Sequence, residues 1–220
     1  MTSFVFPGQG SQFVGMSKDF YDNFEISKLV LEEIEEHIGL NIKKIIFEDE
    51  DKLLNLTTYT QISIFAASMM IFKAYENEIG IDKEKINSML GHSLGEYTAL
   101  TCSEKIKLND CSQLLKKRGE LMNDAVEPNK TGMAALIGLS VNQVENIIND
   151  NNINIEIAND NSPIQVVVSG EINEIEKSKE IFKNNQIKRF VPLNVSAAFH
   201  SKFMIEAQKT LNNVIDKTEF

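Results

Sequence analysis

The stretch Gly91-His92-Ser93-Leu94-Gly95-Glu96 constrains this chain more than any other. A serine with a glycine two residues away on each side is typical of a nucleophile elbow, a tight turn that joins a strand to a helix. Such a turn lifts the serine hydroxyl clear of the backbone, and the N–H groups at the start of the helix favour negative charge there. The motif alone is a weak signal. It also requires a strand before it, a helix after it, a base and a site for an oxyanion.

The segments on both sides of the elbow provide the strand and the helix. Residues 86–90 form a short and mostly apolar run that we interpret as a buried strand, and residues 96–102 continue as a helix. Cys102 lies on this predicted helix, and we expect it in the core rather than as a reactive thiol. The context that a nucleophile elbow needs is therefore predicted.

The chain before the elbow predicts one more strand and two helices. Residues 3–6 are apolar and are followed by Pro7, which fits a buried strand that ends there. The loop 8–12 then places two glycines around a polar side chain. This pattern suits an ordinary strand-to-helix loop and equally a close approach of the backbone to another group. Apolar residues at helical spacing follow in 24–38 and in 57–77, and the second of these is apolar on most sides, as a core helix is.

The second half of the chain changes its period. A helix is predicted over 109–125, and after Pro128 short strands and helices follow in the order β-α-β-β-α-β, which is that of a ferredoxin-like unit. The predicted strands lie at 133–137, 153–157, 165–169 and 188–192, and the predicted helices at 141–150 and 171–184. We therefore expect a ferredoxin-like subdomain at 129–194, inserted in an α/β body made of 1–128 and 195–220.

Composition narrows the class of protein. The chain has 220 residues, of which 42% are hydrophobic, and its net charge of −10 argues against nucleic acid, which is bound through Lys and Arg. No apolar run is long enough for a membrane span, and the first residues lack the pattern of a signal peptide. Two cysteines are too few for a disulfide framework or a metal cluster. We therefore expect a cytoplasmic protein with no metal, no membrane and no nucleic acid.

The candidate base for Ser93 is found among three histidines. A serine hydroxyl is a weak nucleophile and needs an adjacent base. His37 lies on a separate predicted helix, and His92 precedes the serine in a turn from which neighbouring side chains diverge. His200 remains, and a serine followed much later by a histidine is the order of the α/β-hydrolases. The alternative is that His200 is a structural histidine.

Several motifs together resemble the malonyl-CoA:acyl carrier protein transacylase family, the acyltransferases that load malonyl units in fatty-acid synthesis. They occur in the order of that family and cover essentially the whole chain. The matching stretches are Phe6-Pro7-Gly8-Gln9-Gly10-Ser11-Gln12, Tyr59-Thr60-Gln61, the elbow, Arg118 with Leu121-Met122, Asn161-Ser162-Pro163 with Val168-Ser169-Gly170, and Val195-Ser196-Ala197-Ala198-Phe199-His200-Ser201. The resemblance implies an α/β-hydrolase-like parallel-sheet body with an inserted ferredoxin-like subdomain.

The resemblance also implies roles for single residues. Ser93 is the expected nucleophile and His200 the expected base. The oxyanion site is expected to consist of the backbone N–H groups of Leu94, which also follows from elbow geometry, and of Gln12. Arg118 is expected to bind the malonyl carboxylate bidentately, although an arginine in a Lys-Lys-Arg run is by default a surface residue. Further residues are expected to line the substrate site: Gln9, Gln61, His92, Asn161 and Phe199. Two of these carry a remark: Gln61 has a helix contact as its alternative, and Phe199 matches the malonyl-using variants.

The implied reaction has two steps and needs no cofactor. Malonyl passes from malonyl-CoA to Ser93, and the phosphopantetheine thiol of acyl carrier protein then removes it. We expect a monomer. Because both partners are anionic and the chain is acidic, a local basic patch is one hypothesis, with separate solvated side chains as the equal alternative. The patch would consist of Lys116, Lys117, Lys188, Arg189 and Lys202.

The sequence departs from the family in two places. The chains of the family are longer at the C-terminus, where they supply core strands and the carbonyl that orients the histidine. Ser103-Glu104-Lys105 also replaces a small, glycine-containing helix end. These departures leave three alternatives open: a serine thioesterase or hydrolase, an inactive truncated fragment that needs another chain, and a polyketide acyltransferase.

Overall fold

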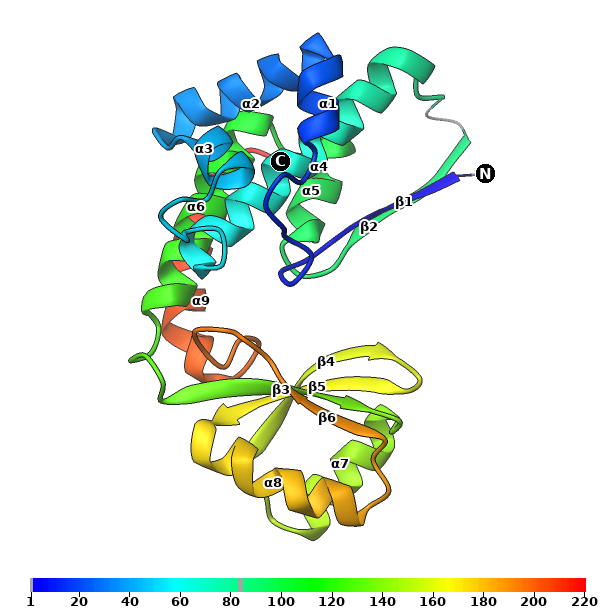
Figure 1. Ribbon diagram of the computed structural model, residues 1–220, viewed down its shortest axis with the longest axis vertical. Coiled ribbons are helices and arrows are strands. Elements are labelled where there is room, and N and C mark those ends of the chain that lie inside the picture. Colours follow the sequence, from blue (N-terminus) through cyan, green and yellow to red (C-terminus); the bar gives the residue numbers. More distant parts are fainter. Residues whose placement is uncertain (1, 83–84) are drawn as a thin grey trace. The chain divides into compact units, whose positions relative to one another are not determined.

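The computed structural model describes residues 2–82 and 85–220 and divides the chain into two compact units. The first contains the chain up to Glu120 together with Leu211–Phe220, and the second contains Leu121–Thr210. Figure 1 shows the helices and strands of both units. Each unit is described by itself below.

A parallel pair of strands carries the elbow in the first unit. β1 (Thr2–Phe6) pairs with β2 (Ile86–Gly91), with Phe4 opposite Met89 and Phe6 opposite Gly91. The side chains of Phe4 and Phe6 turn inward onto the ring of Phe72, at centroid distances of 5.5 and 6.0 Å. Both strands end at the same edge of the pair, as parallel strands do. The two predicted strands are therefore confirmed, and their ends bring the loop 8–12 and the elbow to one edge.

Helices form most of the first unit (Figure 1). They are α1 (Lys18–Asn23), α2 (Glu25–Ile38), α3 (Ile42–Phe47), α4 (Thr57–Ile79), α5 (Gly95–Cys102) and α6 (Leu108–Asp124), and α9 (Ile205–Ile215) reaches this unit with its last residues. The prediction of a core helix is confirmed, because α4 buries fourteen of its residues on all sides. α1 and α3, of six residues each, are too short to show a helical period and were not predicted.

The cysteines belong to the core of this unit. Cys102 and Cys111 are both free thiols and both buried. Burial raises the pKa of the Cys102 thiol and raises that of Cys111 to about 12, because a thiolate loses solvation in an apolar environment. The expectation that Cys102 is a core residue is confirmed.

The second unit contains an antiparallel sheet of four strands in the order β4-β5-β3-β6. The strands are β3 (Thr131–Ile137), β4 (Ile155–Ser162), β5 (Gln165–Glu171) and β6 (Arg189–Pro192), and the helices are α7 (Val141–Asp150) and α8 (Ile172–Asn184). This confirms the predicted ferredoxin-like order. The expected range 129–194 encloses all four strands, and the compact unit adds residues on both sides.

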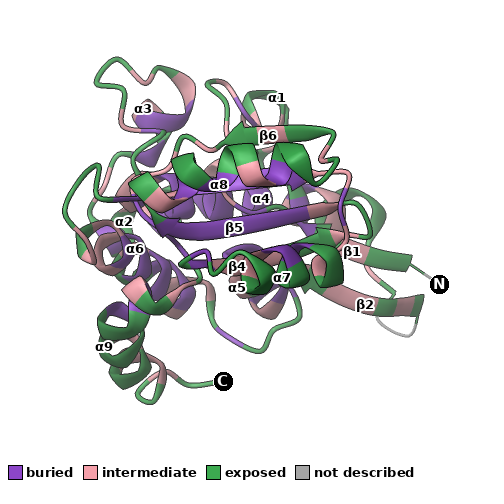
Figure 2. Ribbon diagram, turned by 90° about the horizontal axis from the view of Figure 1, so that it is seen from below, coloured by how far each residue is buried: buried purple, intermediate pink, exposed green. Residues whose placement is uncertain are grey.

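The two faces of this sheet bury different groups. Leu136, Val166 and Val168 pack with residues of α7 and α8, among them the fully buried Phe182. On the other face, Met133 and Val167 pack with Ala197, Phe199 and Met204 of the segment that follows β6. β5 is therefore buried along most of its length (Figure 2). The segment that carries His200 is thus laid on the sheet by its apolar neighbours.

Within the described part of the chain, no helix combines the length and the apolar character that crossing a bilayer requires.

Candidate active site

Ser93 occupies the turn between β2 and α5. Its φ angle is 53°, in the left-handed region that residues with a Cβ adopt rarely. The N–H of Gly95 donates to the carbonyl of His92 at 2.9 Å, and the N–H of Glu96 donates to that of Ser93 at 3.1 Å. Strained backbone of this kind is typical of functional sites. The strand, the tight turn and the helix that the motif predicts are all present.

The two glycines of the motif are required by close backbone packing. A Cβ on Gly91 would lie 1.9 Å from the carbonyl carbon of Gly95, and a Cβ on Gly95 would lie 2.4 Å from the carbonyl oxygen of Phe6. Real Cβ atoms do not approach backbone atoms so closely. The chain therefore folds as a nucleophile elbow only with glycine at both positions.

Gly91→Ala is expected to destabilise the elbow by about 3 kcal/mol or more, because the added methyl group overlaps backbone that cannot move freely. Gly132→Ala is the matched control, since a Cβ there meets nothing closer than Ile172 Cγ1 at 3.9 Å. Urea unfolding of both variants measures the effect. Equal unfolding midpoints for the two variants would contradict the expected role of Gly91.

The loop 8–12 lies against the elbow. A Cβ on Gly8 would lie 2.6 Å from both Nδ1 and the carbonyl oxygen of His92, and the N–H of His92 donates to Phe6 at 3.1 Å. Of the two interpretations of this loop, the structure therefore supports close backbone approach. The side chain of Gln12 holds the loop, because its Oε1 accepts from the N–H of Gly10 at 2.8 Å and its Nε2 donates to Asn55 at 2.9 Å.

Arg118 reaches the nucleophile from α6. Its Nη2 donates to Ser93 Oγ at 3.0 Å, and its Nη1 donates to Oε1 of Gln61. Only 8% of Arg118 and 1% of Gln61 are exposed. The default interpretation of Arg118 as a surface residue is therefore wrong, and Gln61 is part of the same cluster. A buried cation with two fixed partners is poised beside the serine hydroxyl.

Tyr97 completes this cluster and was missed by the sequence analysis. The guanidinium carbon of Arg118 lies 5.6 Å from the centroid of the Tyr97 ring, a cation–π arrangement. Burial lowers the pKa of Arg118 and raises that of Tyr97, and the interaction between the two opposes both shifts. The spacing of four residues from Ser93, which places Tyr97 one helical turn further on, was the available signal.

α6 lies close to the start of α4, and this contact positions Arg118. A Cβ on Gly119 would lie 3.0 Å from the carbonyl oxygens of Thr57 and Thr58. The side chain of Gln9 donates from Nε2 to Oγ1 of Thr57 at 3.3 Å. Gln9, at the edge of the loop 8–12, is thereby connected to the helix that bears Gln61. Ser93, Leu94, His92, Gln9, Gln12, Gln61 and Arg118 all belong to the first unit.

The other expected site residues belong to the second unit, which contains His200, Phe199 and Asn161. His200 is exposed, and its φ of 54° is again left-handed. Phe199 is 5% exposed and packs in the core of its unit, and Asn161 is on β4. The pairing of His200 with Ser93 stays a prediction.

The five residues of the hypothetical basic patch are distributed over both units. Lys116 donates to the carbonyl of Ile38 at 2.8 Å, and Lys117 forms an ion pair with Glu120 at 3.4 Å. In the second unit, Lys202 lies 3.6 Å from Glu156. These partners reduce the positive charge that the lysines offer to an anionic partner.

Comparison with known proteins assigns the family. The model of the acyl transferase domain matches residues 3–219. A malonyl CoA-acyl carrier protein transacylase of Bacillus subtilis (strain 168) is 36% identical over 217 residues, which are 97% of this chain and 67% of that protein. One of Staphylococcus aureus (strain MRSA252) is 34% identical over 223 residues, which are 100% of this chain and 70% of that protein.

Solved structures agree with this assignment. The transacylase of Clostridium perfringens has a TM-score of 0.90 at 38% identity, with 99% of this chain and 68% of that chain covered. The acyl-carrier-protein S-malonyltransferase of Bartonella henselae has 0.93 at 37%, with 100% and 71% covered. A malonyl-transacylase solved with its type II polyketide synthase acyl-carrier protein has 0.92 at 32%, with 99% and 70% covered.

These likenesses extend over the whole described fold and not over the elbow alone. They confirm the predicted fold class, a parallel-sheet body of the α/β-hydrolase type with a ferredoxin-like subdomain. The chain belongs to the acyl transferase domain family.

Proposed function

We propose that this chain transfers malonyl from malonyl-CoA to the phosphopantetheine thiol of an acyl carrier protein. The observation that carries the proposal is the hydrogen bond from the buried Arg118 to Ser93 Oγ at 3.0 Å. A nucleophile beside a buried guanidinium suits an acyl group that ends in a carboxylate. The names of the Bacillus and Staphylococcus relatives support the same substrate.

Ser93 and His200 carry the proposed chemistry. His200 takes the proton of Ser93 Oγ while the oxygen attacks the thioester carbonyl of malonyl-CoA. The tetrahedral oxyanion accepts hydrogen bonds from the N–H groups of Leu94 and Gln12. When the C–S bond breaks, the imidazolium protonates the sulfur of coenzyme A. The thiol of the carrier protein then attacks the malonyl ester, with His200 again as the base, and restores Ser93.

Arg118 provides the proposed selectivity. Acetyl and malonyl differ by the free carboxylate, which a planar guanidinium can bind with two parallel hydrogen bonds. Gln61 and Tyr97 hold the guanidinium at its other nitrogen and at its face. Because the cation is already buried in place, little of the binding energy is lost in ordering it. His92, Gln9, Asn161 and Phe199 complete the proposed substrate site.

The setting of the reaction is part of the proposal. We place the enzyme in the cytoplasm and expect a monomer. The two cysteines are free thiols, which persist in a reducing compartment. The net charge of −10 favours a solvated and monomeric state. Fatty-acid synthesis is the proposed pathway, and polyketide synthesis is the alternative that the complex with a polyketide carrier protein suggests.

Intact mass spectrometry tests the proposal. We expect a malonyl adduct on the protein after incubation with malonyl-CoA, and its transfer to added acyl carrier protein. An adduct that is lost to water instead would identify a thioesterase or hydrolase. A folded protein that forms no adduct would rule out both activities.

A further inference from the structure

His200 lies in a segment whose backbone conformation must be held by its surroundings. Its φ of 54° is in the left-handed region, where the Cβ of an L-residue is crowded. A conformation of this kind persists only when neighbouring contacts over-determine it. The backbone groups on both sides of His200 therefore deserve a complete account of their partners.

Two buried side chains bind the backbone before His200. The N–H of Ala198 donates to Thr131 Oγ1 at 2.9 Å, and Ser169 Oγ donates to the carbonyl of Phe199 at 2.6 Å. Thr131 is 4% exposed and Ser169 is 0% exposed. A hydrogen bond shielded from water in this way is a strong restraint on the backbone.

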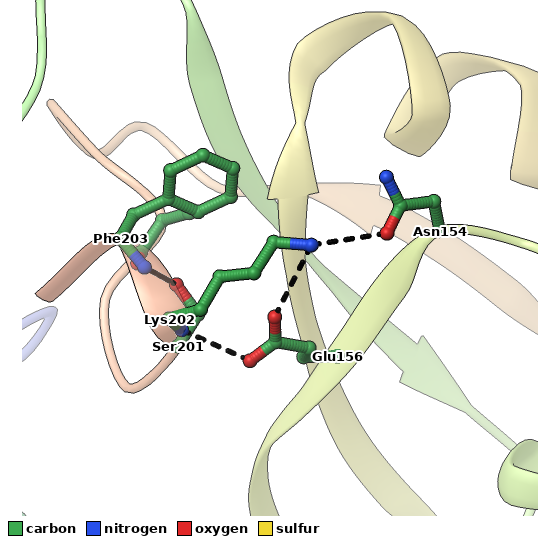
Figure 3. A network of polar contacts seen from close by, with 6 residues as sticks. Asn154, Glu156, Ser201, Lys202 and Phe203 are labelled. Atoms are coloured by element: carbon green, nitrogen blue, oxygen red, sulfur yellow. Dashed lines mark hydrogen bonds and ion pairs between the residues drawn. The ribbon is translucent and has the colours of Figure 1, made fainter. Parts of the chain in front are cut away.

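A third side chain binds the backbone after His200. The N–H of Lys202 donates to Glu156 Oε2 at 3.0 Å, as Figure 3 shows. The ammonium of Lys202 lies 3.6 Å from the other oxygen of Glu156 and donates to Asn154 at 3.0 Å. Ser201 Oγ closes the turn by donating to the carbonyl of Ala198 at 2.6 Å.

The three side chains come from one face of one sheet. Thr131 is on β3, Glu156 on β4 and Ser169 on β5, and Glu156 lies directly opposite Ser169 in the pairing of β4 with β5. Residues opposite each other in an antiparallel pair point to the same face. Thr131 shares this face, because it precedes Met133, the partner of Ser169, by two residues. Adjacent strands thus hold the segment at three points.

We propose that Ser169, Thr131 and Glu156 are positioning residues that hold His200 in the geometry of a general base. The proposal rests on the proposed function, in which His200 takes the proton of Ser93. A base must lie within hydrogen-bond reach of its proton, and a misplacement of about 1 Å costs on the order of 10²-fold in rate. The three residues act on the backbone of the His200 segment.

The test is Ser169→Ala, with Ser178→Ala as the matched control. Both serines are 0% exposed, and both hydroxyls donate to a backbone carbonyl, that of Ser178 to Ile175 at 2.7 Å. We expect Ser169→Ala to lower kcat for malonyl transfer about 10- to 100-fold with an unchanged KM for malonyl-CoA. Ser178→Ala is expected to leave kcat unchanged. Equal kcat values for the two variants would overturn the proposal.

A double variant separates positioning from a general structural effect. In a His200→Ala background, Ser169→Ala is expected to cause no further loss, since the group that it positions is gone. Multiplied losses would contradict the proposal. Glu156→Ala provides a second test at a partly exposed position, in case Ser169→Ala fails to fold. We expect Glu156→Gln to restore the rate lost in Glu156→Ala, because an amide oxygen still accepts from Lys202.

A spectroscopic measurement distinguishes this proposal from the proposed function. The imidazole Cε1–H resonance of His200, assigned by its loss in His200→Ala, is expected to shift or broaden in Ser169→Ala and to stay unchanged in Ser178→Ala. If the wild-type protein transfers no malonyl, the proposed function is wrong, and the resonance still decides whether Ser169 positions His200. An unshifted resonance in Ser169→Ala would overturn the positioning role.

Discussion

Ser93→Ala is expected to abolish the malonyl adduct and to lower malonyl transfer by a factor on the order of 10⁴ to 10⁶. Removal of a serine nucleophile has effects of this size because every covalent step depends on it. The fold is expected to persist, since alanine keeps the Cβ that the left-handed turn already accommodates. Intact mass and a continuous assay of carrier-protein loading measure the two effects.

The control for Ser93→Ala is Ser103→Ala. Ser103 follows the last residue of α5, is exposed and donates to the carbonyl of Leu100 at 3.1 Å. We expect this variant to form the adduct at the wild-type rate. A malonyl adduct on Ser93→Ala would show that another group is acylated, and the assignment of Ser93 as the nucleophile would then be wrong.

Arg118→Ala is expected to lower malonyl transfer at least about 30-fold more than acetyl transfer. Truncation of one partner of a buried charge pair costs about 2–5 kcal/mol, and acetyl lacks the carboxylate that would form this pair. Arg118→Lys is expected to recover only part of the loss, because an ammonium cannot form two parallel hydrogen bonds. The ratio of kcat/KM for malonyl-CoA and acetyl-CoA is the measurement.

Lys117→Ala is the control for Arg118→Ala. Lys117 is the preceding residue of α6, and its ammonium is paired with Glu120 at 3.4 Å. We expect no change in the ratio of malonyl to acetyl transfer. Equal losses of malonyl and acetyl transfer in Arg118→Ala would remove the selectivity role of Arg118 and leave it a structural partner of Gln61.

Much of the fold was predictable because its signals are local. The period of apolar residues indicated α4, the two strands of the parallel pair and the four strands of the second unit. The glycines at positions 91 and 95 indicated the elbow, since they act on backbone within five residues of each other. The short helices α1 and α3 escaped because six residues do not establish a helical period.

The candidate site was only partly predictable because its contacts join distant residues. Arg118 looked like one of three adjacent surface cations until the packing of α6 buried it beside Ser93. Tyr97 had no motif to mark it, because its role comes from the ring that it places against the guanidinium. The same holds for Ser169, whose hydroxyl binds the carbonyl of Phe199 thirty residues away.

The sequence by itself determined the strand–turn–helix at Ser93, the order of the ferredoxin-like strands and the residue types of an acyl-transfer site. These properties depend on period, turn chemistry and motif, which are local properties of the chain. Tertiary structure decided that Arg118 is buried and bonded to Ser93, and that three strands hold the backbone around His200. Burial and hydrogen bonding between distant residues exist only after the chain has packed, so no reading of neighbours along the sequence contains them.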